Sequence, residues 1–523
     1  ITSPDGTTFE FTQCDTTILE HAQTGTSPQS RIQTRNWKLS KIIQFNNKEV
    51  NFYYYPSSTI YNVTNLSQSF EKSKLQSTYV HGGLDVVQKS RLKSITGSGS
   101  PWNTPNIPNN YSSTYQTVSY LEEISFPEGK ISFILSERED LVGAKKVDSI
   151  NISNYNNEII SKFKLSYSYF ESVINGHYYN HYGDQQVIEK RLKLLLVEKV
   201  GIPPYQFYYN QANLPIKTSF ATDYWGYFNG FDNTSFLANP IRFNHPSGIE
   251  TFSNWNNHSA NADSCKACIL EKIVYPTGGF TIYDYELNSF ETSYSLDQIP
   301  DYNSVLSQES QGNGLRINKI TKFTSNQVPV KTFTYFYSGG IALEGTRIIA
   351  HPYFHELEEV ETSTNSFHCE DHSYFGYSIS SSNYFTVPLF GKSGVGYSKV
   401  TTKEFSNNLD NGKTEKYFFN QQNKRSRKEI QIPSIAPSIE NGLINAEIVY
   451  DSAMNQVKRN NYYYHSENSD LFYGVRFSFD GYFYHGLFWS NPPYFNGVKE
   501  VQFLAGMYPI SSSETLLDSS QSI

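Results

Sequence analysis

The sequence predicts an all-β protein made of consecutive antiparallel hairpins. Aromatic residues are abundant, with 41 Tyr, 36 Phe and 5 Trp, whereas charged residues make up only 18% of the chain. Apolar and polar residues alternate with a period of two in many segments, as side chains do on the two faces of a strand. Short groups of Pro, Gly and Asn separate these segments and favour tight turns. Helix-rich proteins rely instead on Ala, Leu, Glu and Lys.

The charge balance excludes some classes of partner. The 523 residues include 42 Lys and Arg against 50 Asp and Glu, which gives a formal net charge of -8. Binding to nucleic acid or to an anionic membrane depends on clustered basic residues, so neither is expected. The sequence has no run of 18 or more apolar residues, so we predict no transmembrane helix.

Three hairpins with tight turns are predicted from alternating segments on either side of a turn signal. Asn tolerates the left-handed backbone of a tight turn, Pro presets the first corner and Gly supplies the positive φ after it. These hairpins span residues 41–55 with a turn at 46–48, 123–133 with a turn at 127–129, and 271–285 with a turn at 276–279.

Three further hairpins are predicted with looser turns. They span residues 315–337 with a turn at 324–327, 397–419 with a turn at 410–412, and 446–464 with a turn at 454–455. Self-similar hairpins that cannot bury their faces alone imply a wound repeat sheet, a solenoid or a partial shell.

The segments between the hairpins are polar and rich in turn residues. Residues 96–113 and 304–314 are expected to be long polar loops, and residues 84–92 and 187–200 short helices, although 187–200 also alternates as a strand would. Since no clear linker divides the chain, we expect one continuous β-repeat body over 1–523. A sub-division into 1–200, 201–310 and 311–523 is the alternative.

Five segments resemble the YD-repeat, or Rhs-type, family of bacterial cell-surface proteins, specifically the divergent region that precedes the regular repeats. Most hairpins lack the literal Tyr-Asp and the Gly-Arg turn of the regular repeat. The resemblance rests on residues 442–451 leading to Tyr464, 270–280, 223–230, 314–317 and 394–398.

The resemblance implies a function and a location. It implies a non-enzymatic scaffold, such as an adhesin, a surface-displayed protein or a segment of a delivery shell, that is secreted or lies on the surface of a Gram-negative bacterium. It also implies a protein partner or an enclosed polypeptide, and association with an outer-membrane complex. An accessory module that binds glycan or protein at the outer membrane is the alternative, because exposed Tyr and Trp rings can stack on sugars.

The cysteines offer one local pair. Cys265 and Cys268 form a C-x-x-C, which can be a redox pair, half of a zinc site or a disulfide. A thioredoxin-like motif needs a strand-to-helix setting, but the segment from Leu270 onward is predicted to be a strand. Zinc would need two more ligands. We therefore expect a local disulfide or free thiols.

A second group of residues has ligand chemistry. His368, Cys369 and His372 lie within five residues together with two carboxylates, and such clusters bind metal when the fold brings their side chains together. This group is the metal candidate and would serve a metal-dependent hydrolase, the remaining alternative. On a strand, residues four apart share a face but lie about 13 Å apart, too far for one ion. The sequence contains no nucleophile elbow, phosphate loop or dinucleotide fingerprint, so no catalytic residue and no cofactor is predicted.

Overall fold

The structure of the chain is a computed structural model. It describes residues 1–23, 29–81, 92–93, 109–173, 189–236, 241–245, 248–252, 256–290, 311–342, 349–363, 366–380, 394–420, 441–464, 467–477, 498–507 and 510–517. The regular secondary structure of these residues is almost entirely β, and 23 strands form one antiparallel sheet. The predicted fold class is confirmed.

Most strands of this sheet pair with their neighbours in chain order. In order of pairing they are β1 (Thr8–Gln23), β2 (Gln29–Ile43), β3 (Glu49–Tyr54), β7 (Leu121–Phe126), β8 (Gly129–Glu137), β9 (Lys145–Asn154), β10 (Ile159–Glu171), β11 (Lys190–Lys199), β12 (Tyr205–Tyr209), β15 (Leu270–Val274), β16 (Phe280–Ser289), β17 (Gln311–Phe323), β18 (Pro329–Ala342), β21 (Val395–Ser406), β22 (Leu409–Phe418), β23 (Ile444–Tyr450), β24 (Gln456–Tyr464) and β27 (Ile510–Leu517). Among the described strands β27 pairs only with β24, so the sheet is open.

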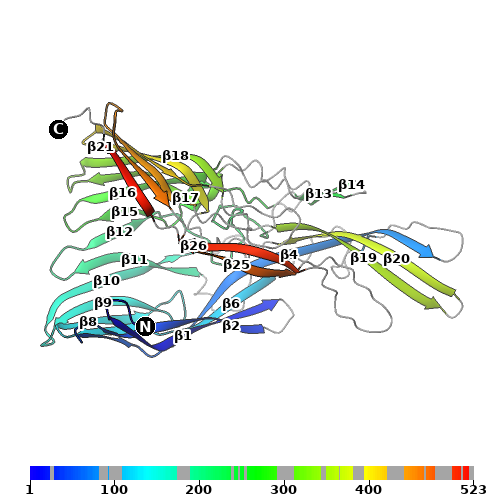
Figure 1. Ribbon diagram of the computed structural model, residues 1–523, viewed down its shortest axis with the longest axis horizontal. Helices are drawn as coiled ribbons and strands as arrows, with labels where there is room; N and C mark the ends of the chain where they lie inside the picture. The colour runs from blue at the N-terminus through cyan, green and yellow to red at the C-terminus, as the bar shows by residue number, and fades with distance from the viewer. Residues whose placement is uncertain are drawn as a thin grey trace.

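The N-terminal end of the sheet continues into a long ribbon. β6 (Asn109–Val118) joins β1 to the first half of β4 (Ser58–His81), and the second half of β4 pairs with β20 (Ser366–Ser380). β20 in turn pairs with β19 (Ile349–Ser363). A hairpin inserted between β18 and β21 thus lies against a strand almost 300 residues earlier, and Figure 1 shows β4, β19 and β20 running out together.

The remaining elements are small. β5 (Leu92–Lys93) pairs with β4, and α2 (Ala262–Cys265) is a single helical turn. Two separate pairs are β13 (Ile241–His245) with β14 (Gly248–Phe252) and β25 (Glu467–Phe477) with β26 (Val498–Met507). The helix expected over 187–200 is wrong, because its strand-like alternation prevails and β11 forms there, whereas 84–91 lies outside the described residues.

The same five-residue turn closes several hairpins. The first residue donates its amide to the fifth carbonyl and accepts from the fourth amide, and the fourth residue has positive φ, as at Asn47 (φ 60°) and Gly278 (φ 83°). This is a type I turn followed by a left-handed residue, a common three-residue hairpin loop. It occurs at residues 44–48, 154–158, 275–279, 324–328 and 451–455.

One predicted turn is misplaced. The hairpin of β21 and β22 turns at Asn407 and Asn408, which both have positive φ, and not at 410–412. Two adjacent left-handed asparagines make a two-residue turn whose twist matches that of the strands. Asp410 and Gly412 lie inside β22, beside a register shift.

A tyrosine on the second strand of six hairpins bonds to the first strand at a β-bulge. Tyr285 of β16 donates its hydroxyl to the Leu270 carbonyl of β15 at 2.9 Å, and the next residue, Glu271, is extra in the pairing of β15 with β12. A bulge disrupts the ladder locally, so the hydroxyl supplies a donor where the backbone pattern is interrupted. We call this arrangement the tyrosine–bulge unit. Its hydroxyl–carbonyl pairs, 2.6–2.9 Å long, are Tyr54–Leu39, Tyr167–Val147, Tyr209–Leu194, Tyr285–Leu270, Tyr337–Ile317 and Tyr464–Ile444.

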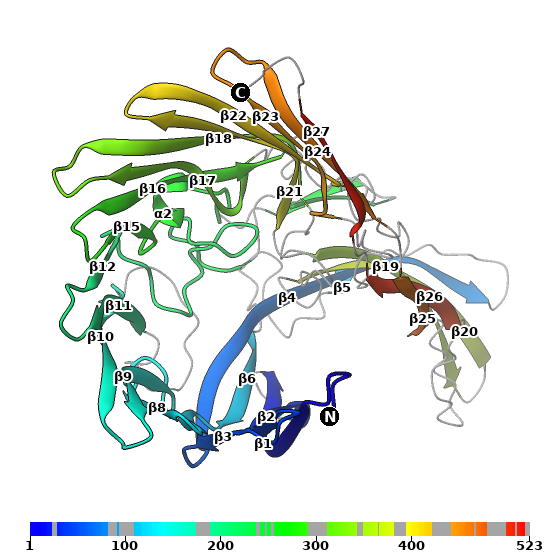
Figure 2. The same ribbon diagram turned by 60° about the vertical axis from the view of Figure 1, so that its left-hand side comes forward.

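In every unit the residue after the acceptor is the extra one. These bulge residues are Ser40, Asp148, Leu195, Glu271, Asn318 and Asn445. Bulges bend the strand that carries them and increase its twist, and repeated bulges are a way to curve a sheet. Figure 2 shows the sheet curving from β3 through β10 and β15 to β24, with one concave and one convex face.

The units also keep a constant stagger. We compare the residue before the bonded tyrosine in each unit, for example Tyr208 and Asp284. Tyr208 pairs with Lys272, which pairs with Ile282 of β16. Asp284 lies two positions further along β16 than Ile282. The same advance of one residue per strand holds from Tyr53 in β3 to Tyr463 in β24. With a rise of about 3.4 Å per residue and about 4.8 Å between strands, the line through equivalent residues is tilted by roughly 35°.

Removing one hydroxyl tests the tyrosine–bulge unit. Tyr285→Phe keeps the ring but leaves the Leu270 carbonyl at the bulge without its donor, so we expect the free energy of unfolding to fall by about 1–2 kcal/mol. Urea unfolding followed by circular dichroism measures the change. Tyr208→Phe is the control, because its hydroxyl makes a solvent-exposed hydrogen bond to the Gln206 side chain and none to a bulge carbonyl. Equal losses in the two variants would contradict the unit's role.

Candidate functional site: an inner segment on the concave face

The chain between β12 and β15 lies on the concave face of the sheet. Its described parts outside the β13–β14 pair, residues 210–236 and 256–269, are here called the inner segment. Figure 2 shows α2 and the chain around it inside the curve of the sheet, and α2 contacts β16 and β17. Because this segment has almost no regular structure, its backbone groups need partners other than a ladder.

A tight turn at Asp223 organises the first half of the inner segment. One carboxylate oxygen of Asp223 accepts from the amides of Trp225, Gly226 and Tyr227 at 2.8–2.9 Å. Asp223 and Tyr224 are both 3% exposed. The carboxylate thus replaces a helical or strand ladder for three consecutive amides, which is why an aspartate precedes this aromatic run.

Buried amides join the two halves of the inner segment. Asn229, only 1% exposed, donates to the carbonyls of Thr222, Asn257 and Ser259 at 2.8–3.2 Å. Asn233 donates to the Asn257 carbonyl at 3.0 Å and accepts from the Asn257 amide at 2.8 Å. Each amide satisfies backbone groups that would otherwise be buried without partners.

The buried histidine of this segment is part of the same network. His258 is 2% exposed, and its Nδ1 donates to the Thr222 carbonyl. Its own carbonyl accepts from the Tyr224 amide at 3.0 Å. These contacts are structural, and sequence reasoning missed His258 because a single histidine in a polar stretch carries no spacing signal.

Aromatic rings of the inner segment pack on glycine backbone at the start of β17. A Cβ on Gly312 would lie 2.5 Å from Trp225 Cζ3, and a Cβ on Gly314 would lie 2.7 Å from Tyr227 Cζ. Both glycines have positive φ, at 138° and 85°. Only glycine therefore allows the rings to approach the sheet so closely.

Trp225 also covers a small apolar core where β16, β18 and β21 meet. Phe290, Ala342 and Val395 are 2–4% exposed, and Trp225 and Tyr397 pack against them. The Trp225 and Phe290 ring centroids are 5.6 Å apart in an edge-to-face arrangement.

A network of polar and charged side chains beside this core connects β16, β17, β18 and β21. The Arg316 guanidinium donates to Glu286 at 2.7 Å and to the Tyr397 hydroxyl at 2.8 Å, and it stacks over the Tyr337 ring at 4.4 Å from the centroid. Burial raises the pKa of Tyr337 to about 12, against the opposing charge of Arg316. Tyr337 therefore stays protonated and keeps donating to the Ile317 carbonyl.

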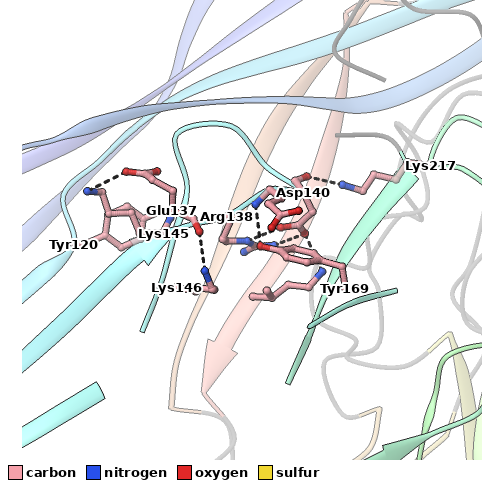
Figure 3. Close-up of polar contacts among 10 residues, drawn as sticks. Tyr120, Glu137, Arg138, Asp140, Lys145, Lys146, Tyr169 and Lys217 are labelled. Carbon is pink, nitrogen blue, oxygen red and sulfur yellow. Dashed lines mark hydrogen bonds and ion pairs between the residues drawn. The ribbon is translucent and has the colours of Figure 1, made fainter. Parts of the chain in front are cut away.

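The inner segment is also held at the connection between β8 and β9, which we call the second anchor. Arg138 forms a two-pronged ion pair with Asp140 at 2.7 and 2.9 Å, and the Lys217 ammonium of the inner segment donates to the Asp140 carbonyl at 2.9 Å. Figure 3 shows Arg138 and Lys217 approaching Asp140 from different directions. The Leu192 amide also donates to the carboxylate.

The pKa of Asp140 follows from these contacts. Burial alone would raise the pKa of the Asp140 carboxyl, but hydrogen bonds from Arg138 and the Leu192 amide outweigh burial and hold the pKa below its ordinary value of 3.8. The Asp140 carboxylate is therefore ionised at neutral pH, and its role is structural.

The structure places the predicted cysteine pair in α2 and just after it. Cys265 and Cys268 are free thiols here, so the disulfide stays a prediction. Burial raises the pKa of Cys265 to about 12, which leaves little reactive thiolate at neutral pH. Cys268 donates to the Ala212 carbonyl at 3.3 Å.

The metal candidate falls within a strand. His368, Cys369 and His372 lie in β20, where they pair with Glu361, Val360 and Leu357 of β19. The rise of a strand separates the Cα atoms of His368 and His372 by about 13 Å, which does not support one shared ion. Their side chains lie outside the described part of the chain, so the metal site stays a prediction. No group of three or more His, Cys, Asp or Glu suited to a metal occurs among the residues that the structure describes.

The motifs that carry the family resemblance converge. Trp225 of the 223–230 segment lies over Gly312, just before the 314–317 segment, and Arg316 of that segment bonds to Tyr397 of the 394–398 segment. A Cβ on Gly394 would collide with the side chain of Asn313. These motifs can be recognised in the sequence, but nothing in the sequence indicates that they lie together in the fold.

Comparisons with known proteins add little. No family model matches the chain, and no curated protein matches it. Among solved structures, the crystal structure of TcdB2-TccC3 matches at 8% sequence identity and a TM-score of 0.15, covering 84% of this chain and 18% of that chain. The chain thus spans about a fifth of that chain's length, and a TM-score this low establishes neither shared fold nor shared function. No helix among the described residues is long and apolar enough to span a membrane. The YD-repeat assignment therefore stays an interpretation of the sequence motifs.

Gly312→Ala tests the packing of Trp225 on the sheet. Gly442→Ala is the matched control, because Gly442 also has positive φ but a Cβ added there would have nothing within 4 Å. Both variants acquire backbone strain, but only Gly312→Ala forces the indole away, which we expect to cost about 1–3 kcal/mol more in the free energy of unfolding. Urea unfolding and tryptophan emission measure the effect. An unchanged emission maximum together with equal midpoints would rule out the close contact.

Asp140→Asn tests the second anchor through pH. The folded-state pKa of Asp140 is lowered, so its contribution to stability is fully present above pH about 4 and is lost as the pH falls through the folded-state pKa. We expect the variant to be less stable than the unmodified chain by about 1–2 kcal/mol at pH 7, and the difference to shrink below pH 4. The exposed Glu122→Gln should leave the pH profile unchanged. A difference at pH 3 that is as large as the difference at pH 7 would disprove the ion pair's role.

Proposed function

We propose that this chain is a non-enzymatic β-scaffold, secreted or displayed on the surface of a Gram-negative bacterium, that holds polypeptide against its concave face. The observation that carries the proposal is the inner segment itself. A long irregular stretch of polypeptide already lies on that face, and the sheet supplies groups that recognise backbone.

The recognising groups are of two kinds. Polar side chains bind carbonyls: Arg191 of β11 donates to the Pro215 carbonyl at 2.9 Å, and Ser172 donates to the same oxygen at 3.1 Å. Glycine backbone at the start of β17 contacts the rings of Trp225 and Tyr227. Neither kind depends on catalytic chemistry, and both suit an extended or irregular polypeptide.

The scaffold role is supported by the way the sheet is stiffened. Tyrosine–bulge units recur along the sheet, and each links the two strands of its hairpin by a hydrogen bond outside the ladder. The location rests on the resemblance of the five motif segments. The described residues offer no observation that favours a metal-dependent hydrolase.

Site-specific photo-cross-linking in the producing bacterium tests the proposal. Tyr227→p-benzoylphenylalanine places the probe in the inner segment, where Tyr227 is 44% exposed, and Tyr155→p-benzoylphenylalanine places it in the turn of β9 and β10, where Tyr155 is 74% exposed. We expect a defined cross-link to a polypeptide from position 227 and none from position 155. Protease added to intact cells should also degrade the chain. Equal cross-linking at both positions, or protection of the chain until the cells are lysed, would refute the proposal.

A further inference from the structure

The tyrosine–bulge units define a regular row of exposed residues on the opposite face of the sheet. The residue before each bonded tyrosine is exposed in all six units. Four of these positions are aromatic, with exposed fractions of 47–54%, although aromatic residues are only 16% of the chain. The row consists of Tyr53, Ser166, Tyr208, Asp284, Phe336 and Tyr463.

The row lies on the convex face. Tyr337 contacts Tyr397 at 4.9 Å between centroids, and Tyr397 packs against the same apolar core as Trp225 of the inner segment, so the bonded tyrosines lie on the concave side. Side chains alternate along a strand, so the preceding residue points away from that side. Lys272 of the neighbouring strand lies over the Tyr208 ring at 5.5 Å and covers part of one ring face.

The row is evenly spaced from Ser166 to Phe336, whereas Tyr53 and Tyr463 at its two ends each lie four strands from the next member. Each hairpin moves the row two strands across and two residues along, which amounts to about 12 Å. Tyr208, Asp284 and Phe336 are consecutive members, so the two rings stand about 24 Å apart with a carboxylate midway.

The fold itself does not require rings at these positions. Ser166 and Asp284 occupy the same position in units whose bonded tyrosines, Tyr167 and Tyr285, make the same hydrogen bond. A half-exposed aromatic side chain leaves apolar surface in water, so Tyr53, Tyr208 and Phe336 are explained better by a ligand than by packing.

The spacing selects the class of ligand. A protein partner would need its strongest contacts gathered in one central, fully dried patch, whereas these rings are separated and alternate with polar positions. A polymer of repeating units can place one unit on each ring, and sugars offer C–H faces that stack on the negative face of an aromatic ring. The hydroxyl groups between the stacked units can donate to the Asp284 carboxylate.

We propose that the convex face binds a linear polysaccharide along this row, with sugar rings stacked on Tyr208 and Phe336 and hydroxyls donating to Asp284. This site is independent of the polypeptide held on the concave face. Because each ring contributes a modest contact, binding depends on the simultaneous use of several rings and grows steeply with the length of the sugar chain.

The test uses the purified full chain and soluble linear polysaccharides, namely xylan, galactomannan, mixed-linkage β-glucan and glycol chitosan, in native affinity gels. We expect at least one of them to retard the chain. We expect the double variant Tyr208→Ser with Phe336→Ser to weaken that retardation roughly tenfold or more. The matched control is Phe45→Ser with Tyr155→Ser, which removes two rings that are 77% and 74% exposed in turns outside the row.

Several outcomes would overturn the inference. They are the absence of retardation by all four polysaccharides, equal loss in the row and turn variants, and equal affinity for fragments of four and of twelve sugar units. Circular dichroism spectra that match the unmodified chain show that the row variant is folded. Tyr208→Phe, which keeps the ring, should retain binding and provides a second reading if the double variant does not fold.

Discussion

The curved part of the architecture depends on satisfying one backbone carbonyl at each of six β-bulges. A bulge curves the sheet, but it also removes a carbonyl from the regular ladder, and a partly buried carbonyl without a donor is costly. A tyrosine hydroxyl from the following strand donates to that carbonyl in six hairpins. The recurrence of tyrosine at these six positions and the curvature at their bulges therefore have one cause. Without the hydroxyl the bulge would be a defect, and without the bulge the sheet would lose a source of its curvature.

Curvature in turn allows distant motifs to meet. On the concave face the inner segment reaches from the β8–β9 connection, where Lys217 bonds to the Asp140 carbonyl, to the start of β17, where Trp225 lies over Gly312. Its backbone groups are satisfied by Asp223, Asn229 and similar side chains instead of a ladder. Segments near residues 225, 316 and 397 thereby share one small core, which explains why each carries glycine or aromatic residues.

The sequence predicted those features of the fold that depend only on residues close together in the chain. Alternation and turn residues located the hairpins around 46–48, 276–279 and 324–327, because a five-residue turn needs only one left-handed position. They also located the two-residue turn between Phe126 and Gly129. The turn at Asn407 and Asn408 was missed, since Asp410 to Gly412 offers an equally good local signal and only strand register distinguishes them. The pairing of β20 with β4 and the meeting of Trp225 with Gly312 depend on long-range geometry, which no window of sequence contains.

The tyrosine–bulge units contain two kinds of aromatic residue, which amino-acid composition alone does not distinguish. Within each unit, adjacent positions face opposite sides of the sheet, and only the second must be tyrosine because only its hydroxyl reaches the bulge. Tyr208 and Tyr209 are neighbours in one strand, yet Tyr209 bonds to the Leu194 carbonyl while Tyr208 is 47% exposed. Asp284 beside Tyr285 shows that the first position is free to vary. The residue before the bonded tyrosine therefore varies with what the convex face contacts. The bonded tyrosine is the same in all six units because the bulge requires its hydroxyl.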